Sequence, residues 1–294
     1  MRRLASFSVL LAAGGVAALT PGLVQASARK APHVCNGTTS KPGVLTGRYR
    51  SGVVVKGFCE VNSGPAHVIG TLKLNRGSAL IAAFGQKHSK LTVTGDVTVG
   101  QGATFVLGCN TTSSPCADDP NQNAPTLTSP GTVTGNITSN APLGVIIHST
   151  TVGGDVTQTG GGGGLSCTPP KTGPFAMFMS PVFSDYEDNA ITGDLTVTKV
   201  TSCYLGIIRN GVSAMKVTYD SMGDPDAIEI ETNVIKHNLA CWHDKQHVWD
   251  SHETTETGLY PRALSRNTVH GNRKGQCRTA GPLTQNGPPA GGPF

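Results

Sequence analysis

The sequence predicts an all-β protein built as a single right-handed parallel β-helix of roughly ten coils, each of about 20 residues. The phrase LTVTGDVTV at residues 91–99 alternates apolar and polar side chains, as a half-buried strand does. The phrase returns as TVTGNIT, TVGGDVT and ITGDLTV, with a looser copy, VVVKGFCEV, nearer the N-terminus. The chain also holds 38 glycines, only 5% aromatic residues and no convincing amphipathic helix, which favours strands joined by many turns.

The spacing of the copies is the second observation. Their glycines are separated by 38, 40, 19 and 39 residues, close to one or two multiples of about 19.5, and a fixed period of this size is typical of stacked coils. A β-sandwich would not keep inward glycines at multiples of one step. We interpret each copy as one strand of a coil, with its glycine at a bend or a close-packing site. The aligned glycines are Gly57, Gly95, Gly135, Gly154 and Gly193.

The N-terminal segment has the composition of an export signal. Arg2 and Arg3 precede an apolar stretch at residues 4–19 and small residues near 24–28, which is the pattern of a secretory signal peptide. No later run approaches the roughly 20 apolar residues of a membrane-spanning helix. We therefore expect a secreted protein with no membrane span.

We divide the chain into four parts. Residues 1–26 form the signal peptide, 27–52 an N-terminal lead-in or cap, 53–280 the β-helix domain, and 281–294 a disordered Pro/Gly tail. Loop insertions are expected near 109–125, which is rich in proline and asparagine, and near 160–188, which opens with five glycines. The apolar residues of the second insertion favour a flap packed on the coils over a ligand pocket.

Charge excludes one class of partner. The formal net charge is 23 − 18 = +5, or +3 without Arg2 and Arg3, and the charged residues are sparse and mixed in sign. Nucleic-acid binding needs a concentrated basic face, so we expect no nucleic-acid partner.

Eight cysteines, an even number in an exported chain, indicate disulfides. Sequence alone allows 105 connectivities. We favour pairs of neighbours in sequence, because successive coils stack about 4.8 Å apart, within the range that a disulfide spans. The sequence contains no Cys-x-x-Cys pair, so it gives no support for a zinc site or for thioredoxin-like chemistry. The expected pairs are Cys35–Cys59, Cys109–Cys116, Cys167–Cys203 and Cys241–Cys277.

Two late segments resemble a known group of proteins. NVIKHNLAC at 233–241 and NTVHGNRKGQC at 267–277 are similar to the closing coils of exported bacterial right-handed parallel β-helix proteins, within the wider pectin-lyase-like group. The resemblance covers about 53–277. It implies strand-turn-strand coils with columns of inward aliphatic side chains, in a branch without an assigned activity.

An acidic cluster in GDPDAIEIE is the first candidate site. Side chains two apart on a strand lie about 6.6 Å apart, which suits an inverting pair of carboxylates or part of a calcium site. Polysaccharide lyases of the similar fold carry such carboxylates on one outer face beside a lysine or arginine base, for which Lys216 and Arg209 are the candidates, although no lyase motif is matched. The competing interpretation is a solvated outer face, with Ile228 and Ile230 inward. The catalytic candidates are Asp224, Asp226, Glu229, Glu231, Lys216 and Arg209, and Asp226, Glu229 and Glu231 are the candidate calcium ligands.

The segment ACWHDKQHVWDSH is the second candidate and holds both tryptophans of the chain. On a helical turn, His243 and His247 would share a face and could bind a metal. On a loop, Trp242 and Trp249 would suit stacking on a sugar. The competing interpretation is an exposed loop whose aromatic rings pack on the coils.

Two classes of function follow. The first is an exported, non-catalytic protein whose rigid surface binds a polysaccharide, a cell-envelope component or a protein. The second is a polysaccharide lyase or glycoside hydrolase that uses the acidic face, with calcium as its cofactor. The first is favoured because the sequence matches no catalytic motif and packing alone explains most residues.

Overall fold

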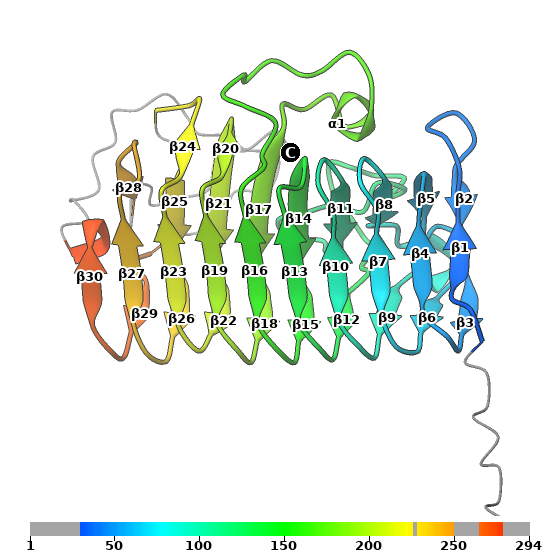
Figure 1. Ribbon diagram of the computed structural model, residues 1–294, viewed down its shortest axis with the longest axis horizontal. Coiled ribbons are helices and arrows are strands. Elements are labelled where there is room, and N and C mark those ends of the chain that lie inside the picture. The colour runs from blue at the N-terminus through cyan, green and yellow to red at the C-terminus, as the bar shows by residue number, and fades with distance from the viewer. Residues whose placement is uncertain (1–29, 226–227, 250–264, 279–294) are drawn as a thin grey trace, which may run out of the picture. The chain divides into compact units, whose positions relative to one another are not determined.

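A computed structural model describes residues 30–225, 228–249 and 265–278. Nearly all of its secondary structure consists of short parallel strands in three long sheets (Figure 1). Sheet 1 contains, in spatial order, β1 (His33–Cys35), β4 (Val53–Val55), β7 (Leu72–Leu74), β10 (Val97–Val99), β13 (Ile137–Asn140), β16 (Val156–Thr159), β19 (Leu195–Thr198), β23 (Met215–Thr218), β27 (Leu239–Trp242) and β30 (Arg273–Gly275).

Two further sheets complete each coil. Sheet 2 contains β2 (Gly43–Val44), β5 (Phe58–Glu60), β8 (Ala79–Ala82), β11 (Thr104–Leu107), β14 (Gly144–His148), β17 (Phe183–Glu187), β21 (Tyr204–Ile208), β25 (Ile228–Glu231) and β28 (Val248–Trp249). Sheet 3 contains β3 (Gly47–Tyr49), β6 (Ala66–Val68), β9 (Leu91–Val93), β12 (Thr132–Val133), β15 (Thr151–Val152), β18 (Ala190–Ile191), β22 (Gly211–Val212), β26 (Val234–Ile235) and β29 (Thr268–Val269).

The chain visits sheet 1, sheet 2 and sheet 3 in turn and then enters sheet 1 again beside the strand it left. Figure 1 shows the strands of sheet 1 side by side, with the coils advancing in a right-handed sense from β1 to β30. The predicted parallel β-helix is confirmed. Several small elements do not belong to the three long sheets. They are β20 (Thr201–Ser202), which pairs with β24 (Ser221–Met222), the 3-10 turns Gln86–His88 and Gln276–Arg278, and helix α1 (Pro174–Met177).

The repeated phrase at residues 91–99 is not one strand, as we had interpreted it. It is β9 of sheet 3 and β10 of sheet 1, joined by a corner at 94–96. The glycine is required at that corner, because a Cβ atom on Gly95 would lie 2.7 Å from the carbonyl oxygen of Gly70 in the preceding coil. Gly57 lies at a different corner, between β4 and β5, so it does not belong to this column.

The long steps in the repeat also have a different cause from the expected one. Val97 of β10 pairs directly with Ile137 of β13, and Val156 of β16 pairs with Leu195 of β19. Steps of 40 and 39 residues are therefore single coils enlarged by insertions, and no second coil lies within them. The insertions occupy residues 108–131, between β11 and β12, and residues 160–182, between β16 and β17.

The core consists of inward aliphatic columns. In sheet 1 the register stacks one inward side chain of each coil directly on the next, and all of them are buried. Complete burial of such a side chain is worth about 1.5–3 kcal/mol. One column contains Leu72, Val97, Ile137, Val156, Leu195, Met215 and Leu239.

A column of buried asparagines forms the corner between sheets 2 and 3. The side-chain amide of Asn210 donates to the carbonyl oxygen of Tyr186 (2.7 Å) and to the side-chain oxygen of Asn233 (3.0 Å). That oxygen also accepts the backbone N–H of Asn210 (2.8 Å). The same pattern continues through Asn189 and Asn267, so these corners satisfy their polar groups with each other.

The corner between sheets 1 and 2 uses acids instead. One carboxylate oxygen of Asp220 accepts the backbone N–H of Val200 (2.7 Å), and Asp244 does the same for the backbone N–H of Asp220 (2.9 Å). The second oxygens of Asp220 and Asp244 are buried and have no hydrogen-bond partner. Burial, together with the neighbouring Asp244, raises the pKa of Asp220 to about 8, and burial raises the pKa of Asp244 to about 6.

All four predicted disulfides are present: Cys35–Cys59, Cys109–Cys116, Cys167–Cys203 and Cys241–Cys277. Such bonds persist in oxidising compartments and are compatible with an extracellular protein. The coils begin at β1, within the expected lead-in. The predicted signal peptide and the tail after residue 280 lie outside the described residues. None of the helices in the described part is long and apolar enough to cross a bilayer.

The acidic corner predicts a pH dependence of stability. A carboxyl group whose pKa is higher in the folded state contributes stability that is complete below its unfolded pKa, near 3.9, and lost as pH rises through the folded value. We therefore expect the free energy of unfolding to fall between about pH 4 and pH 8, by at most about 1.4 kcal/mol per pH unit for Asp220. Asp220→Asn retains the acceptor for Val200 and should reduce this loss. Urea unfolding at several pH values measures it.

Asp155→Asn is the matched control, because the exposed Asp155 accepts the backbone N–H of Asp194 in the same way (2.9 Å). Equal pH profiles for Asp220→Asn and the wild type would contradict the assignment.

Candidate functional site

The outer face of sheet 2 carries a cluster of ionisable side chains. Glu229 and Glu231 point away from the core of the coils, while Ile228 and Ile230 point inward and are fully buried, as the alternation predicts. The expected solvated face is wrong, however. Glu229 is only 3% exposed and Glu231 is 0% exposed.

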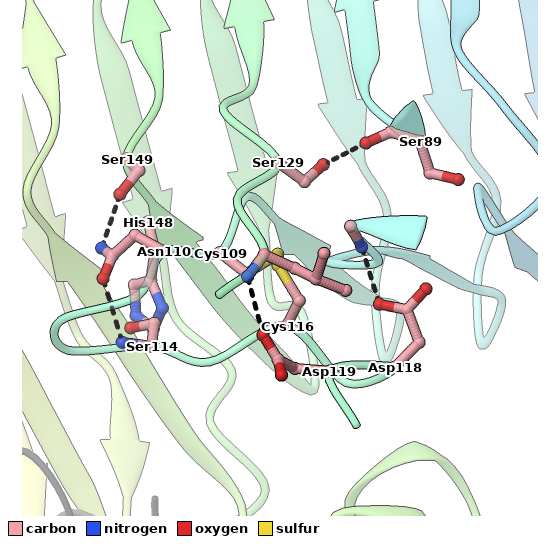
Figure 2. Close-up of a disulfide and its surroundings, with 12 residues drawn as sticks. Ser89, Cys109, Asn110, Ser114, Cys116, Asp118, Asp119, Ser129, His148 and Ser149 are labelled. Carbon is pink, nitrogen blue, oxygen red and sulfur yellow. Dashed lines mark hydrogen bonds between the residues drawn. A yellow bond between two sulfur atoms is a disulfide. The ribbon is translucent and has the colours of Figure 1, made fainter. Parts of the chain in front are cut away.

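Both insertions pack on other parts of this outer face, beside β8, β14 and β17. In the first, the backbone N–H of Ala117 donates to the carbonyl oxygen of Ala83 at the end of β8 (2.9 Å). Figure 2 shows the Cys109–Cys116 loop beside His148, with the Asn110 side chain directed at Ser149. In the second insertion, Phe175 of α1 is fully buried over sheet 2.

Phe175 identifies the second insertion as the expected flap. Its ring meets that of Phe183 edge to face, with centroids 5.6 Å apart. A Cβ atom on Gly144 would lie 2.4 Å from the Phe175 ring, so the glycine makes room for the flap. Cys167–Cys203 ties the same insertion to the segment before β21.

The outer face of sheet 2 and the turn after β17 carry three sets of interacting side chains. His148 contacts Asp185 (Nε2 to Oδ2, 3.1 Å). Arg209 donates to Glu187 (2.8 Å) and, through Nε, to Asp188 (2.8 Å). The hydroxyl of Tyr204 donates to Oε2 of Glu229 (2.9 Å). Burial and then the nearby carboxylates, Glu229 first, raise the pKa of Tyr204 well above its usual value, so this phenol stays protonated.

A glycine allows these pairs to approach one another. Asp185, Gly206 and Glu229 occupy one row across β17, β21 and β25. A Cβ atom on Gly206 would lie 2.4 Å from Oδ1 of Asp185 and 2.7 Å from the hydroxyl of Tyr204. The absence of a side chain at this position brings the phenol and the two acids together.

The candidate catalytic residues from the sequence lie on two different sheets. Arg209 belongs to the cluster with Glu229 and Glu231, whereas Lys216 lies on β23 and is exposed on the outer face of sheet 1. The structure therefore does not bring Lys216 together with the glutamates. Asp224 is half-buried beyond β24, and Asp226 lies outside the described residues.

Sequence reasoning missed five members of the cluster: His148, Asp185, Glu187, Asp188 and Tyr204. The first two are 37 residues apart in sequence because the second insertion lies between them, although β14 and β17 are neighbours. The available signal was the alternation in VIIHS and FSDYE. It places His148, Asp185 and Glu187 on the outer face once the coils are aligned.

The outer face of sheet 1 is open and polar. A hollow of about 240 Å³ lies over β19, β23, β27 and β30. Lys216 and Lys274 flank Ala240 in one row across three strands, so the small alanine leaves the space between two lysines. The hollow is lined by Asp194, Thr196, Ala214, Met215, Lys216, Asn238, Ala240 and Lys274.

Aromatic rings continue this face beyond the hollow. Trp242 lies two residues after Ala240 on β27 and is 44% exposed. Tyr219, 54% exposed, stacks on His243 with ring centroids 4.7 Å apart. Trp242 and Trp249 belong to different sheets, and the side chain of Trp249 is not described.

The helical turn on which His243 and His247 would share a metal is not present between β27 and β28. Both His243 and His247 are exposed in the irregular segment between β27 and β28. The stack on Tyr219 accounts for the position of the first ring.

We found no family model that matches the chain, and no match among curated proteins or solved structures. The similarity to the pectin-lyase-like group therefore stays a prediction from the sequence.

The cluster predicts a large effect of removing its arginine. Arg209→Met deprives Glu187 and Asp188 of their guanidinium partner in a buried setting, which typically costs about 3–5 kcal/mol. Chemical denaturation measures this loss. Lys199→Met is a suitable control, because Lys199 is exposed and has the same left-handed backbone (φ 59° against 56°). The control should change stability by less than about 0.5 kcal/mol. A similarly small change for Arg209→Met would show that the ion pairs do not hold this face.

Proposed function

We propose that this protein is an exported, non-catalytic β-helix that binds an acidic polysaccharide, such as a cell-envelope polymer, on the outer face of sheet 1. The observation that carries the proposal is the hollow between Lys216 and Lys274, which opens on a flat exposed face beside Trp242.

The two lysines supply the charge for an acidic chain. Strands lie about 4.8 Å apart, so side chains two strands apart in one row are separated by roughly 10 Å at the backbone. Two ammonium groups at this separation can hold anionic groups of one extended polymer. Thr196 and Asn238 add hydroxyl and amide groups that can bond to sugar hydroxyls. Asp194, which also lines the hollow, accepts the backbone N–H of Ala214 (3.0 Å).

Trp242 supports a carbohydrate rather than a small anion. An exposed indole offers a large apolar face at little cost in side-chain entropy. It lies on the same face of β27 as Ala240, about 7 Å further along the strand. A sugar chain that runs along β27 would meet the lysines at one unit and the indole at the next.

The N-terminal sequence and the disulfides support export. The N-terminal pattern of a signal peptide and the four disulfides both agree with a protein that folds outside the cytoplasm.

The catalytic alternative, a lyase or hydrolase with calcium, has less support. Its carboxylates, Glu229 and Glu231, are buried, whereas a polymer substrate needs exposed catalytic groups. Lys216, the expected base, faces outward from another sheet.

The binding proposal predicts a loss of affinity for acidic polymers. The wild-type chain should bind polygalacturonate or alginate in calorimetry, more weakly at high salt, and should bind a neutral glucan less well. Removal of both lysines in Lys216→Ala/Lys274→Ala should weaken binding by about tenfold or more, because each charged hydrogen bond is worth about 1.5 kcal/mol. Trp242→Ala should weaken binding at every salt concentration.

Lys73→Ala is the matched control. Lys73 is exposed on β7 in the same outward row of sheet 1 but far from the hollow. The proposal fails if the wild type binds no acidic polysaccharide, or if Lys73→Ala is as damaging as the double variant.

A further inference from the structure

We propose that His148, Asp185 and Glu187 form a binding site for one divalent transition-metal ion, best matched by Zn²⁺. Each residue offers one ligand atom, and the three atoms lie within 4.8 Å of one another. All three side chains are buried on the outer face of sheet 2. The inference is independent of polysaccharide binding, which uses a different sheet.

The donor set selects the metal. One imidazole nitrogen and two carboxylate oxygens are ligands that Zn²⁺ accepts, in sites that often have three protein ligands. Calcium prefers six to eight oxygen ligands and rarely uses imidazole. The site is therefore unlike the calcium site expected at Asp226, Glu229 and Glu231.

The fold holds the three ligands without a special loop. His148 and Glu187 are register partners on the neighbouring strands β14 and β17, and Asp185 is two residues before Glu187 on the same face. Zinc–ligand distances of about 2.1 Å in a tetrahedral site place ligand atoms about 3.4 Å apart. His148 Nε2 and Asp185 Oδ2 are already 3.1 Å apart.

Arg209 has a natural role in such a site. It donates to Oε2 of Glu187, and carboxylates that bind metals commonly accept a hydrogen bond at the same time. The guanidinium thereby orients Glu187 without replacing it as a ligand.

A disulfide-closed loop of the first insertion lies beside the proposed site. The Cys109–Cys116 loop lies beside His148 (Figure 2), and its Asn110 donates to Ser149, the residue that follows (2.6 Å). A metal ion there would link two coils that the second insertion separates in sequence, so it should stabilise the folded chain.

The test uses the full secreted chain, freed of metal with a chelator and then titrated with Zn²⁺ or Ca²⁺ by calorimetry. Dialysis and elemental analysis count the bound ions. We expect one Zn²⁺ per chain, no comparable Ca²⁺ binding, and a higher midpoint of thermal unfolding with Zn²⁺.

Two variants test the ligands. His148→Gln and Asp185→Asn, each checked by circular dichroism to be folded, should weaken Zn²⁺ binding by at least about 100-fold, more than the loss of a ligand's supporting hydrogen bond usually costs. His243→Ala/His247→Ala is the control, since it removes the exposed histidine pair, and it should bind Zn²⁺ as the wild type does. The assignment is overturned if the wild type binds no Zn²⁺, if it binds Ca²⁺ instead, if folded His148→Gln and Asp185→Asn bind as well as the wild type, or if only the control loses the ion.

Discussion

Stacking of coils about 4.8 Å apart is the constraint on which the rest of the structure depends. It places each residue directly above its counterpart in the preceding coil, so a side chain must be compatible with a column of similar neighbours. Aliphatic side chains meet this condition by burying one another. The corner glycines meet it by leaving space, because a Cβ atom on Gly135 would lie 2.3 Å from Oδ1 of Asp96 in the coil before.

Because of the same constraint, asparagine and aspartate make different hydrogen bonds at the corners. An asparagine both donates and accepts, so Asn210 bonds to Asn189 on one side and to Asn233 on the other. An ionised aspartate only accepts. Asp220 and Asp244 consequently satisfy the backbone of the preceding coil with one oxygen each and bury the other without a partner, and their raised pKa values follow from that arrangement.

Local pattern made the fold class and the disulfides predictable, and it placed Ile228 and Ile230 inward correctly. It could not show that the phrase at 91–99 turns a corner, because alternation continues across a short bend. Nor could it show the burial of Glu229, whose partner Tyr204 lies in the preceding coil, 25 residues away in sequence. The partnership of His148 with Asp185 was hidden for the same reason, since 37 residues separate them.

The positions of the insertions explain why two faces of one β-helix have different chemistry. One insertion leaves after β11 and the other enters before β17, so both adjoin sheet 2, and both pack on its outer face beside β8, β14 and β17. The corners from sheet 3 to sheet 1 are short, as at residues 94–96, and carry no such cover. The ionisable groups on the outer face of β14, β17 and β25 are buried, and buried charges are tolerated only when they pair with each other or with an ion. Lys216 and Trp242 on sheet 1 stay exposed, which leaves this face open to the polymer that we propose as its ligand.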